Sequence, residues 1–203
     1  MIRRPPRSTL DRSSAASDVY KRQEVYAFSK ELRKREFVNE NVFNVLDALS
    51  TDTHPMTQFS IAINAMQNES IFAQKYEEGL NKNDYWDATY EDSLNLIAKL
   101  PIVAAYIYRR TYHQGYHIPA DPELDWAGNF AHMLGIHTRD FKALMRLYMT
   151  IHADHEGGNA SAHTMHLVVS TLSDAFFSFA AAMNALAGPL HGLANQEVIK
   201  WIM

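Results

Sequence analysis

Histidine is concentrated in residues 151–196, which carry five of the ten histidines in the chain. Imidazole can move a proton, donate a hydrogen bond or bind a metal ion near neutral pH. Glycine-bearing breaks lie next to two of the five, and glycine lets the backbone approach a ligand closely. This stretch is therefore the first place to look for chemistry. The five residues are His152, His155, His163, His166 and His191.

The first four histidines form an H-x2-H, x7, H-x2-H array, a spacing that raises a metal hypothesis. Imidazoles three residues apart on a helix share a face and can bind Zn²⁺ or Ni²⁺ together. The HExxH motif and the Glu-x-x-His pairs of di-iron bundles are both absent from the sequence. We interpret most of the four as half-buried helix histidines with hydrogen-bond partners. A non-catalytic all-α binding module with a histidine metal site remains the alternative.

A small-anion site is predicted at the helix that follows Gly158. Asn159 or Ser161 can cap this helix, which leaves free backbone N–H groups near His155. Such N–H groups at the positive end of a helix bind anions. On the pattern alone, a capping turn in which His155 is already hydrogen-bonded is the simpler interpretation.

His191 follows a Gly188-Pro189 break, and Pro189 is expected to be the first residue of a helix. His191 would then lie in the first turn of that helix. A neutral imidazole donates one hydrogen bond, so it can stabilise the oxygen of an enol without giving up its proton. On the pattern alone, His191 is a candidate for this role.

The elements that hold these residues are predicted to be helices. From Val25 onward, apolar residues recur every three or four positions, and no stretch alternates with period two over the length of a strand. Pro101 is expected to end a helix over residues 85–100 and to begin the next one. The fold class is therefore predicted to be all-α.

Two helix starts are predicted from their capping residues. His54-Pro55 is expected to begin one helix, and Thr138 is expected to cap another. The second helix should turn its apolar residues towards the core. These are Phe141, Leu144, Met145 and Tyr148.

Composition narrows the class of protein. In 203 residues, 47% are hydrophobic and 21% are charged, values typical of a soluble globular protein. No apolar run reaches the roughly 18 residues of a membrane-spanning helix. There is no cysteine for a disulfide or a thiolate metal site, and the net charge of −4 disfavours nucleic acid as a partner. We therefore expect neither a membrane nor a nucleic-acid partner.

Residues 1–22 differ from the rest of the chain. They are rich in Arg, Ser and Pro, contain six basic and two acidic residues, and lack apolar periodicity. This composition predicts a disordered segment. A mitochondrial transit peptide is the alternative, since such peptides are also rich in Arg and Ser.

Several separated strings resemble citrate synthase of the mitochondrial type. They are HADHEGGN, SAH and GPLHGLANQEV, preceded by THPMTQFSIAI, YWDATYEDSLNLIAKLP and DWAGNFAHMLG. The resemblance extends over about residues 23–203, and it implies that residues 1–22 are foreign to the fold. Several motifs in the right order identify a family far more specifically than one short pattern.

The resemblance implies a multihelical fold and a homodimer. Residues 23–187 would be part of the α-helical large domain, and residues 188–203 the hinge and the first helix of the small domain, with the chain an internal fragment. The activity implied is that of a transferase at the entry of the tricarboxylic acid cycle. No metal or cofactor is implied, because acetyl-CoA is a substrate. The expected location is the mitochondrial matrix, with peroxisome or bacterial cytoplasm as alternatives.

The resemblance also assigns roles to the histidines. His191 matches a residue that donates a hydrogen bond to the thioester carbonyl of acetyl-CoA. His155 matches a histidine that binds oxaloacetate, and Asn159 lies beside that pocket. In the family, the aspartate that removes the methyl proton, a second histidine and the carboxylate-binding arginines lie beyond the point matching Met203. These 203 residues alone are therefore expected to be inactive.

Overall fold

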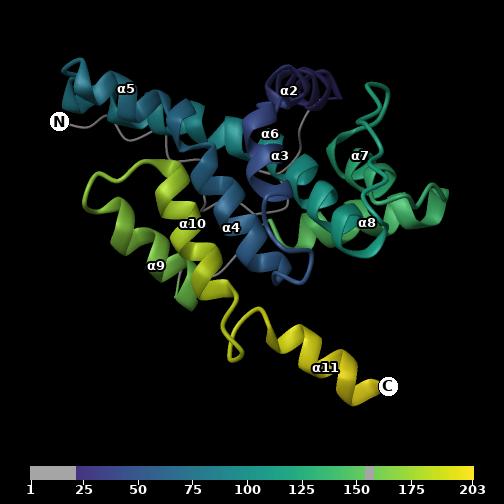
Figure 1. The fold of residues 1–203 in the computed structure, drawn as a ribbon. Helices are drawn as coiled ribbons and strands as arrows, with labels where there is room; N and C mark the ends of the chain where they lie inside the picture. The colour runs from purple at the N-terminus through teal and green to yellow at the C-terminus, as the bar shows by residue number, and fades with distance from the viewer. Residues whose placement is uncertain (1–21, 154–157) are drawn as a thin grey trace, which may run out of the picture.

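The computed structural model describes residues 22–153 and 158–203, and these residues form helices and connecting turns without a strand (Figure 1). The predicted all-α class is therefore confirmed for the described residues. The prediction for residues 1–22 concerns residues that lie outside the described part of the chain, with the exception of Arg22. Arg22 is the first residue of the first described helix. The α-helices are α2 (Arg22–Arg35), α3 (Glu40–Asp47), α4 (Pro55–Ala65), α5 (Ile71–Glu77), α6 (Tyr85–Tyr112), α7 (Trp126–Met133), α8 (Arg139–Ile151), α9 (Ala160–Val169), α10 (Ala175–Leu186) and α11 (Ala194–Ile202), and two 3₁₀ turns cover Gln67–Glu69 and Lys82–Asp84.

The helices are arranged around α6, the longest of them. Helices α2, α4, α5, α7 and α10 all pack against it, while α3 packs on α4, α8 on α7 and α9 on α10 (Figure 1). The main core lies where α3, α4, α6 and α10 meet, and burial of its apolar side chains is the main source of stability. Its fully buried members include Leu46, Ile63, Met66, Val103 and Phe176. No helix in the described ranges is long and apolar enough to span a bilayer.

Both predicted helix starts are confirmed by their caps. The His54 side chain accepts a hydrogen bond from the Met56 N–H at the start of α4, with Pro55 in the first turn. Thr138 Oγ1 accepts from the Phe141 N–H at the start of α8. These side chains occupy backbone donors that have no partner within the helix.

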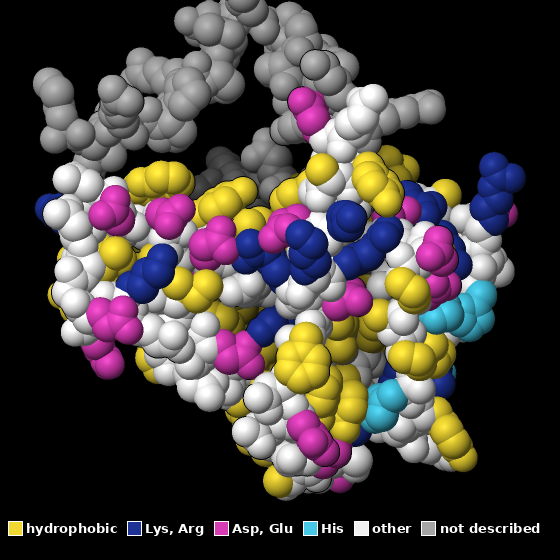
Figure 2. Space-filling model, turned by 90° about the horizontal axis from the view of Figure 1, so that it is seen from above, with side chains coloured by type: hydrophobic (Ala, Val, Ile, Leu, Met, Phe, Trp, Pro, Cys, Tyr) yellow, Lys and Arg dark blue, Asp and Glu magenta, His cyan; other side chains and the backbone are white. Residues whose placement is uncertain are grey.

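The prediction that α8 turns four apolar residues towards the core is only partly correct. Phe141 and Met145 are half-buried, but Leu144 is 57% exposed and Tyr148 is 53% exposed. The amphipathic pattern identified the apolar side of the helix correctly. That side stays open because α8 packs mainly against α7, so no other described helix covers it. Apolar side chains also appear between charged ones on the face shown in Figure 2.

The predicted helix break at Pro101 is wrong, because α6 runs unbroken from Tyr85 to Tyr112 with Pro101 inside it. A proline in a helix interior has no N–H for the carbonyl four residues earlier, a change that costs about 3 kcal/mol. Here that carbonyl belongs to Ile97, and it accepts a hydrogen bond of 2.8 Å from Trp126 Nε1. The indole of α7 therefore replaces the missing backbone donor.

We expect Trp126→Phe to lower the free energy of unfolding by about 1 kcal/mol, because it leaves the Ile97 carbonyl without its protein donor. Chemical denaturation measures the loss. The control is Trp86→Phe, which changes a side chain that is 65% exposed and should leave stability unchanged.

The Pro101→Ala background tests the cause, since alanine restores the backbone N–H that can bond to Ile97. The cost of Trp126→Phe should be smaller in this background than in the wild-type chain. An equal cost in both backgrounds would show that Trp126 acts only through its packing on Leu32, Leu94 and Ala98.

Candidate active site

A helical hairpin brings the two ends of the histidine-rich stretch together. α9 is followed by a tight turn in which Leu172 has φ of +64°, and Asp174 then caps α10 with bonds to two backbone N–H groups. α9 and α10 pack side by side (Figure 1). The start of α9 and the end of α10 therefore lie at the same end of the hairpin.

Of the two residues predicted as caps for α9, Asn159 is the one that caps it. Its Oδ1 accepts a hydrogen bond of 2.9 Å from the Ala162 N–H, and it also accepts one of 2.7 Å from Ser161 Oγ. Ser161, the other residue considered for the cap, instead binds the capping side chain. The start of α9 thus holds two polar side chains in a fixed relation.

The turn after α10 differs from the expected helix. α11 begins at Ala194, so Pro189 starts no helix and His191 precedes α11 instead of lying in its first turn. The Gly192 N–H bonds to the Leu186 carbonyl at 2.9 Å, which folds the chain back over the end of α10. A Cβ on Gly192 would lie 2.6 Å from the same carbonyl oxygen, so this close approach requires glycine. The fold-back keeps residues 188–193 out of helical register.

The fold-back places His191 against the start of α9. His191 Nε2 lies 3.0 Å from Ser161 Oγ, and both residues are half-buried. The structure therefore joins His191, Ser161 and Asn159 in one hydrogen-bonded chain across 32 residues of sequence (159 to 191). Two of the three predicted site residues are brought together by a residue that was considered only as a cap.

The direction of each hydrogen bond follows from the donors available. Asn159 Oδ1 accepts from a backbone N–H, so it is the amide oxygen and must also accept from Ser161. The Ser161 hydroxyl has one proton and gives it to Asn159, so it accepts from His191 Nε2–H. A neutral His191 then carries its lone pair on Nδ1.

His155, the third predicted site residue, lies outside the described residues, as do its neighbours 154–157. Of the array, His152 stacks on Tyr148 at 4.1 Å and places Nδ1 2.7 Å from the Tyr148 carbonyl oxygen. His163 and His166 are exposed on α9. Within residues 22–153 and 158–203 there is no cluster of three or more His, Asp or Glu side chains suited to a metal ion.

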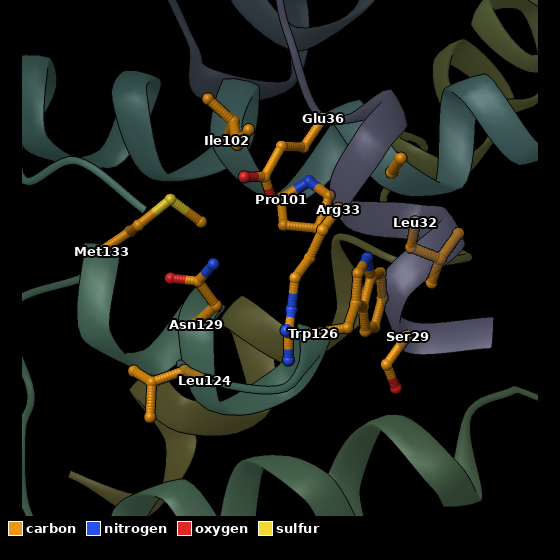
Figure 3. Close-up of a pocket in the computed structure, with 11 residues that line it drawn as sticks. Ser29, Leu32, Arg33, Glu36, Pro101, Ile102, Leu124, Trp126, Asn129 and Met133 are labelled. Carbon is orange, nitrogen blue, oxygen red and sulfur yellow. The ribbon is translucent and has the colours of Figure 1, made fainter. Parts of the chain in front are cut away.

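Two hollows elsewhere in the molecule contain none of the predicted site residues. One lies between α2, α6 and α7, where Arg33 runs between Asn129 and Trp126 (Figure 3). Its volume of about 20 Å³ is that of one water molecule, too small for a substrate. Burial raises the pKa of Glu36 at its edge, against the opposing charge of Arg33.

The second hollow, of about 290 Å³, has an aromatic wall in which His117 stacks on Tyr106 at 3.8 Å. Burial lowers the pKa of His117, and burial together with Asp47 raises the pKa of Tyr106 to about 12. Both side chains are therefore neutral near pH 7. The Tyr106 hydroxyl is already bonded to Asp47, so this wall offers packing and no activated group.

Ser161 is the site residue that the sequence did not identify in its role as partner of His191. The sequence signal for Ser161 was its position near the start of α9, two residues after Asn159, and that signal predicts a role in capping the helix. Contact with a residue 30 positions later depends on the hairpin.

Comparison with known proteins shows what this chain is similar to. The family described as citrate synthase, C-terminal domain, matches residues 16–203. A mitochondrial citrate synthase of Daucus carota is 59% identical over 181 residues, which cover 89% of this chain and 38% of that protein. Citrate synthase 4, mitochondrial, of Arabidopsis thaliana is 57% identical over 184 residues, or 91% of this chain and 39% of its own length.

The fold supports the same relationship. The crystal structure of citrate synthase from Pyrobaculum aerophilum superposes with a TM-score of 0.80 at 30% identity, covering 91% of this chain and 46% of that one. The chain spans about two fifths of the length of the curated relatives it matches. These matches do not favour a non-catalytic metal-binding module. Because the match runs over nearly the whole chain and its helices superpose on those of a solved member, the chain belongs to the citrate synthase family.

Proposed function

We propose that this chain is the part of a citrate synthase that provides the enol-stabilising histidine and one wall of the oxaloacetate site. The reaction condenses acetyl-CoA with oxaloacetate and releases citrate and CoA. The observation that carries the proposal is the hydrogen-bonded chain from His191 through Ser161 to Asn159. It places the residue matching the family's thioester-binding histidine against the helix start predicted to bind the dianion.

His191 would act as an electrostatic catalyst. When the methyl group of acetyl-CoA loses a proton, negative charge develops on the thioester oxygen, and a positioned N–H stabilises it. A neutral imidazole has one N–H, and in this structure it is Nε2–H, bonded to Ser161. To donate from Nδ1, His191 needs Nε2 to accept instead, which requires Ser161 to turn its hydroxyl proton from Asn159 towards the ring. Ser161 would therefore control which nitrogen carries the proton.

The oxaloacetate side of the site would be the start of α9. This helix has ten residues, and the backbone N–H groups and dipole at its first turn favour a carboxylate. Asn159 holds that turn in place through its cap, and the resemblance assigns direct contact with the ligand to His155. The resemblance places the proton-abstracting aspartate, the second histidine and the arginines outside these residues, so this chain needs further sequence to be active.

Domain organisation follows the same proposal. Residues 23–187 form part of the large domain, and residues 188–203 are the hinge and the start of the small domain. α11 supports this division because it extends away from the helical body (Figure 1). Its Trp201 is 85% exposed, which suits a helix that packs on another part of a longer protein.

The functional protein would lie in the mitochondrial matrix, because the relatives are named as mitochondrial enzymes. The family resemblance implies that it would be a homodimer. Peroxisome and bacterial cytoplasm are the alternatives. The condensation needs no metal or cofactor, since the acetyl group arrives on a substrate and the work is proton transfer and charge stabilisation. Neither nucleic acid nor a membrane is a partner.

A chimera tests the proposed role of His191. Residues 16–203 replace the matching segment of the Daucus carota enzyme, and thiol release from acetyl-CoA is followed with oxaloacetate present. We expect turnover, with kcat lowered by about 10²–10³ in the His191→Ala variant, as when one donor to a developing oxyanion is removed. The control His166→Ala changes an exposed side chain of α9 and should keep full activity. Equal turnover by the His191 variant would contradict the assignment.

Ser161 is tested in the same chimera as a positioning residue. Ser161→Ala removes the hydroxyl bonded to His191 and should lower kcat about tenfold while leaving KM for oxaloacetate nearly unchanged. Ser161→Thr keeps a hydroxyl and should restore most of the rate. If Ser161→Thr does not restore kcat, or if Ser161→Ala raises only KM for oxaloacetate, the hydroxyl does not control which nitrogen of His191 carries the proton.

The 203 residues alone are expected to form no citrate. A general base contributes about 10²–10⁴ in rate, and the resemblance places that base elsewhere. Thiol release by this chain should equal that of its His191→Ala variant. Turnover that His191→Ala abolishes would show that these residues contain a complete catalytic set.

A further inference from the structure

The end of α7 reverses the chain in a way that sequence spacing does not reveal. The Ile136 N–H bonds to the Ala131 carbonyl and the Gly135 N–H to the His132 carbonyl, the pair of bonds that defines a Schellman motif. Gly135 has φ of +90°, which an L side chain adopts only with strain. This motif returns the next residues alongside the last turn of α7.

The reversal brings two imidazoles into contact, with their ring planes tilted by 55°. His132 lies in the last turn of α7 and His137 lies two residues beyond Gly135, and their Nδ1 atoms are 3.1 Å apart. The ring centroids are 4.9 Å apart. His137 is exposed and His132 is half-buried, so the pair is open to solvent. In a metal-free chain, one Nδ1–H donates to the lone pair of the other ring.

We propose that His132 and His137 form a chelating site for a late first-row divalent transition-metal ion such as Cu²⁺ or Zn²⁺. Two nitrogens 3.1 Å apart, each about 2.0–2.1 Å from a metal ion, subtend roughly 100° at it, between tetragonal and tetrahedral geometry. When the ion binds, the ring that carries Nδ1–H loses that proton to solvent and takes one up on Nε2, so that both neutral rings present an Nδ1 lone pair to the ion. Water supplies the remaining ligands, because the site has two protein nitrogens.

The local backbone makes this pair better prepared than the histidine array. The Schellman motif holds both rings on a rigid turn, so little side-chain freedom is lost when the ion binds. Thr138 caps α8 directly after His137, which fixes the other side of the turn. His163 and His166, by contrast, are exposed side chains on a single helix face. Imidazole ligands suit Cu²⁺ and Zn²⁺, and Cu²⁺ binds most tightly in the series.

The test is a Cu²⁺ titration of the full 203-residue chain, followed by calorimetry and by the electron paramagnetic resonance of the bound ion. We expect the first equivalent to show coupling to two imidazole nitrogens. His132→Gln and His137→Gln should each weaken binding at least about tenfold, the scale seen even for residues outside the metal's own ligands. The variant with both substitutions should bind Cu²⁺ no more weakly than either single variant, because removing one of the two histidines already abolishes chelation.

Two further variants separate this site from the other histidines and from general folding effects. His163→Gln combined with His166→Gln leaves the pair intact and should keep the first equivalent. Gly135→Ala keeps all histidines but strains the turn, because its Cβ would lie 2.8 Å from Arg109 Nη1, and it should weaken binding while the circular dichroism spectrum stays helical. Three outcomes would overturn the proposal. The affinity could be unchanged in both His132→Gln and His137→Gln, or the losses of these two variants could add up in the double variant. The third is loss of the first bound equivalent in the variant that combines His163→Gln and His166→Gln.

Discussion

The hydrogen bond from Trp126 to the Ile97 carbonyl joins α7 to the helix around which this chain is arranged. Pro101 leaves that carbonyl without its backbone donor inside α6, and the indole supplies one. α6 is one continuous helix that contacts α2, α4, α5, α7 and α10. The same side chain packs on Leu32, Leu94 and Ala98, so one residue joins α2, α6 and α7.

A continuous α6 in turn fixes the platform for the site. α4 and α10 pack on it and on each other, with Phe176 of α10 fully buried in their common core. α9 packs on α10, and His191 meets Ser161 at the open end of this hairpin. Close-packed helices thus position the start of α9 and the turn at residues 188–193 next to each other. Glycine at position 192 allows the second turn to approach the α10 backbone.

Histidines meet their side-chain partners in two different ways in this structure. His191 reaches Ser161 through a tertiary hairpin, whereas His132 and His137 meet through a local reversal that depends on Gly135. Neither pair has the three- or four-residue spacing that places side chains on one helix face. The array at positions 152–166 has that spacing, yet His163 and His166 lie exposed on α9 and His152 binds its own helix.

The sequence by itself determined the helical class, the caps at His54, Thr138 and Asn159, and the family, since these depend on local periodicity, local hydrogen bonds and ordered motifs. Tertiary structure decided the rest. The sequence pattern predicts a helix end at Pro101, but in the structure Trp126 of another helix donates to the Ile97 carbonyl and α6 continues. The pattern also predicts His191 in a first helical turn, but the bond from the Gly192 N–H to the Leu186 carbonyl folds the chain back before α11 begins. Ser161 becomes the partner of His191 because α9 and α10 pack together. The Trp126–Ile97 and His191–Ser161 hydrogen bonds join residues 29 and 30 positions apart, beyond the range of helical periodicity. The Gly192–Leu186 bond is local, but its six-residue span differs from the four-residue spacing of an α-helix.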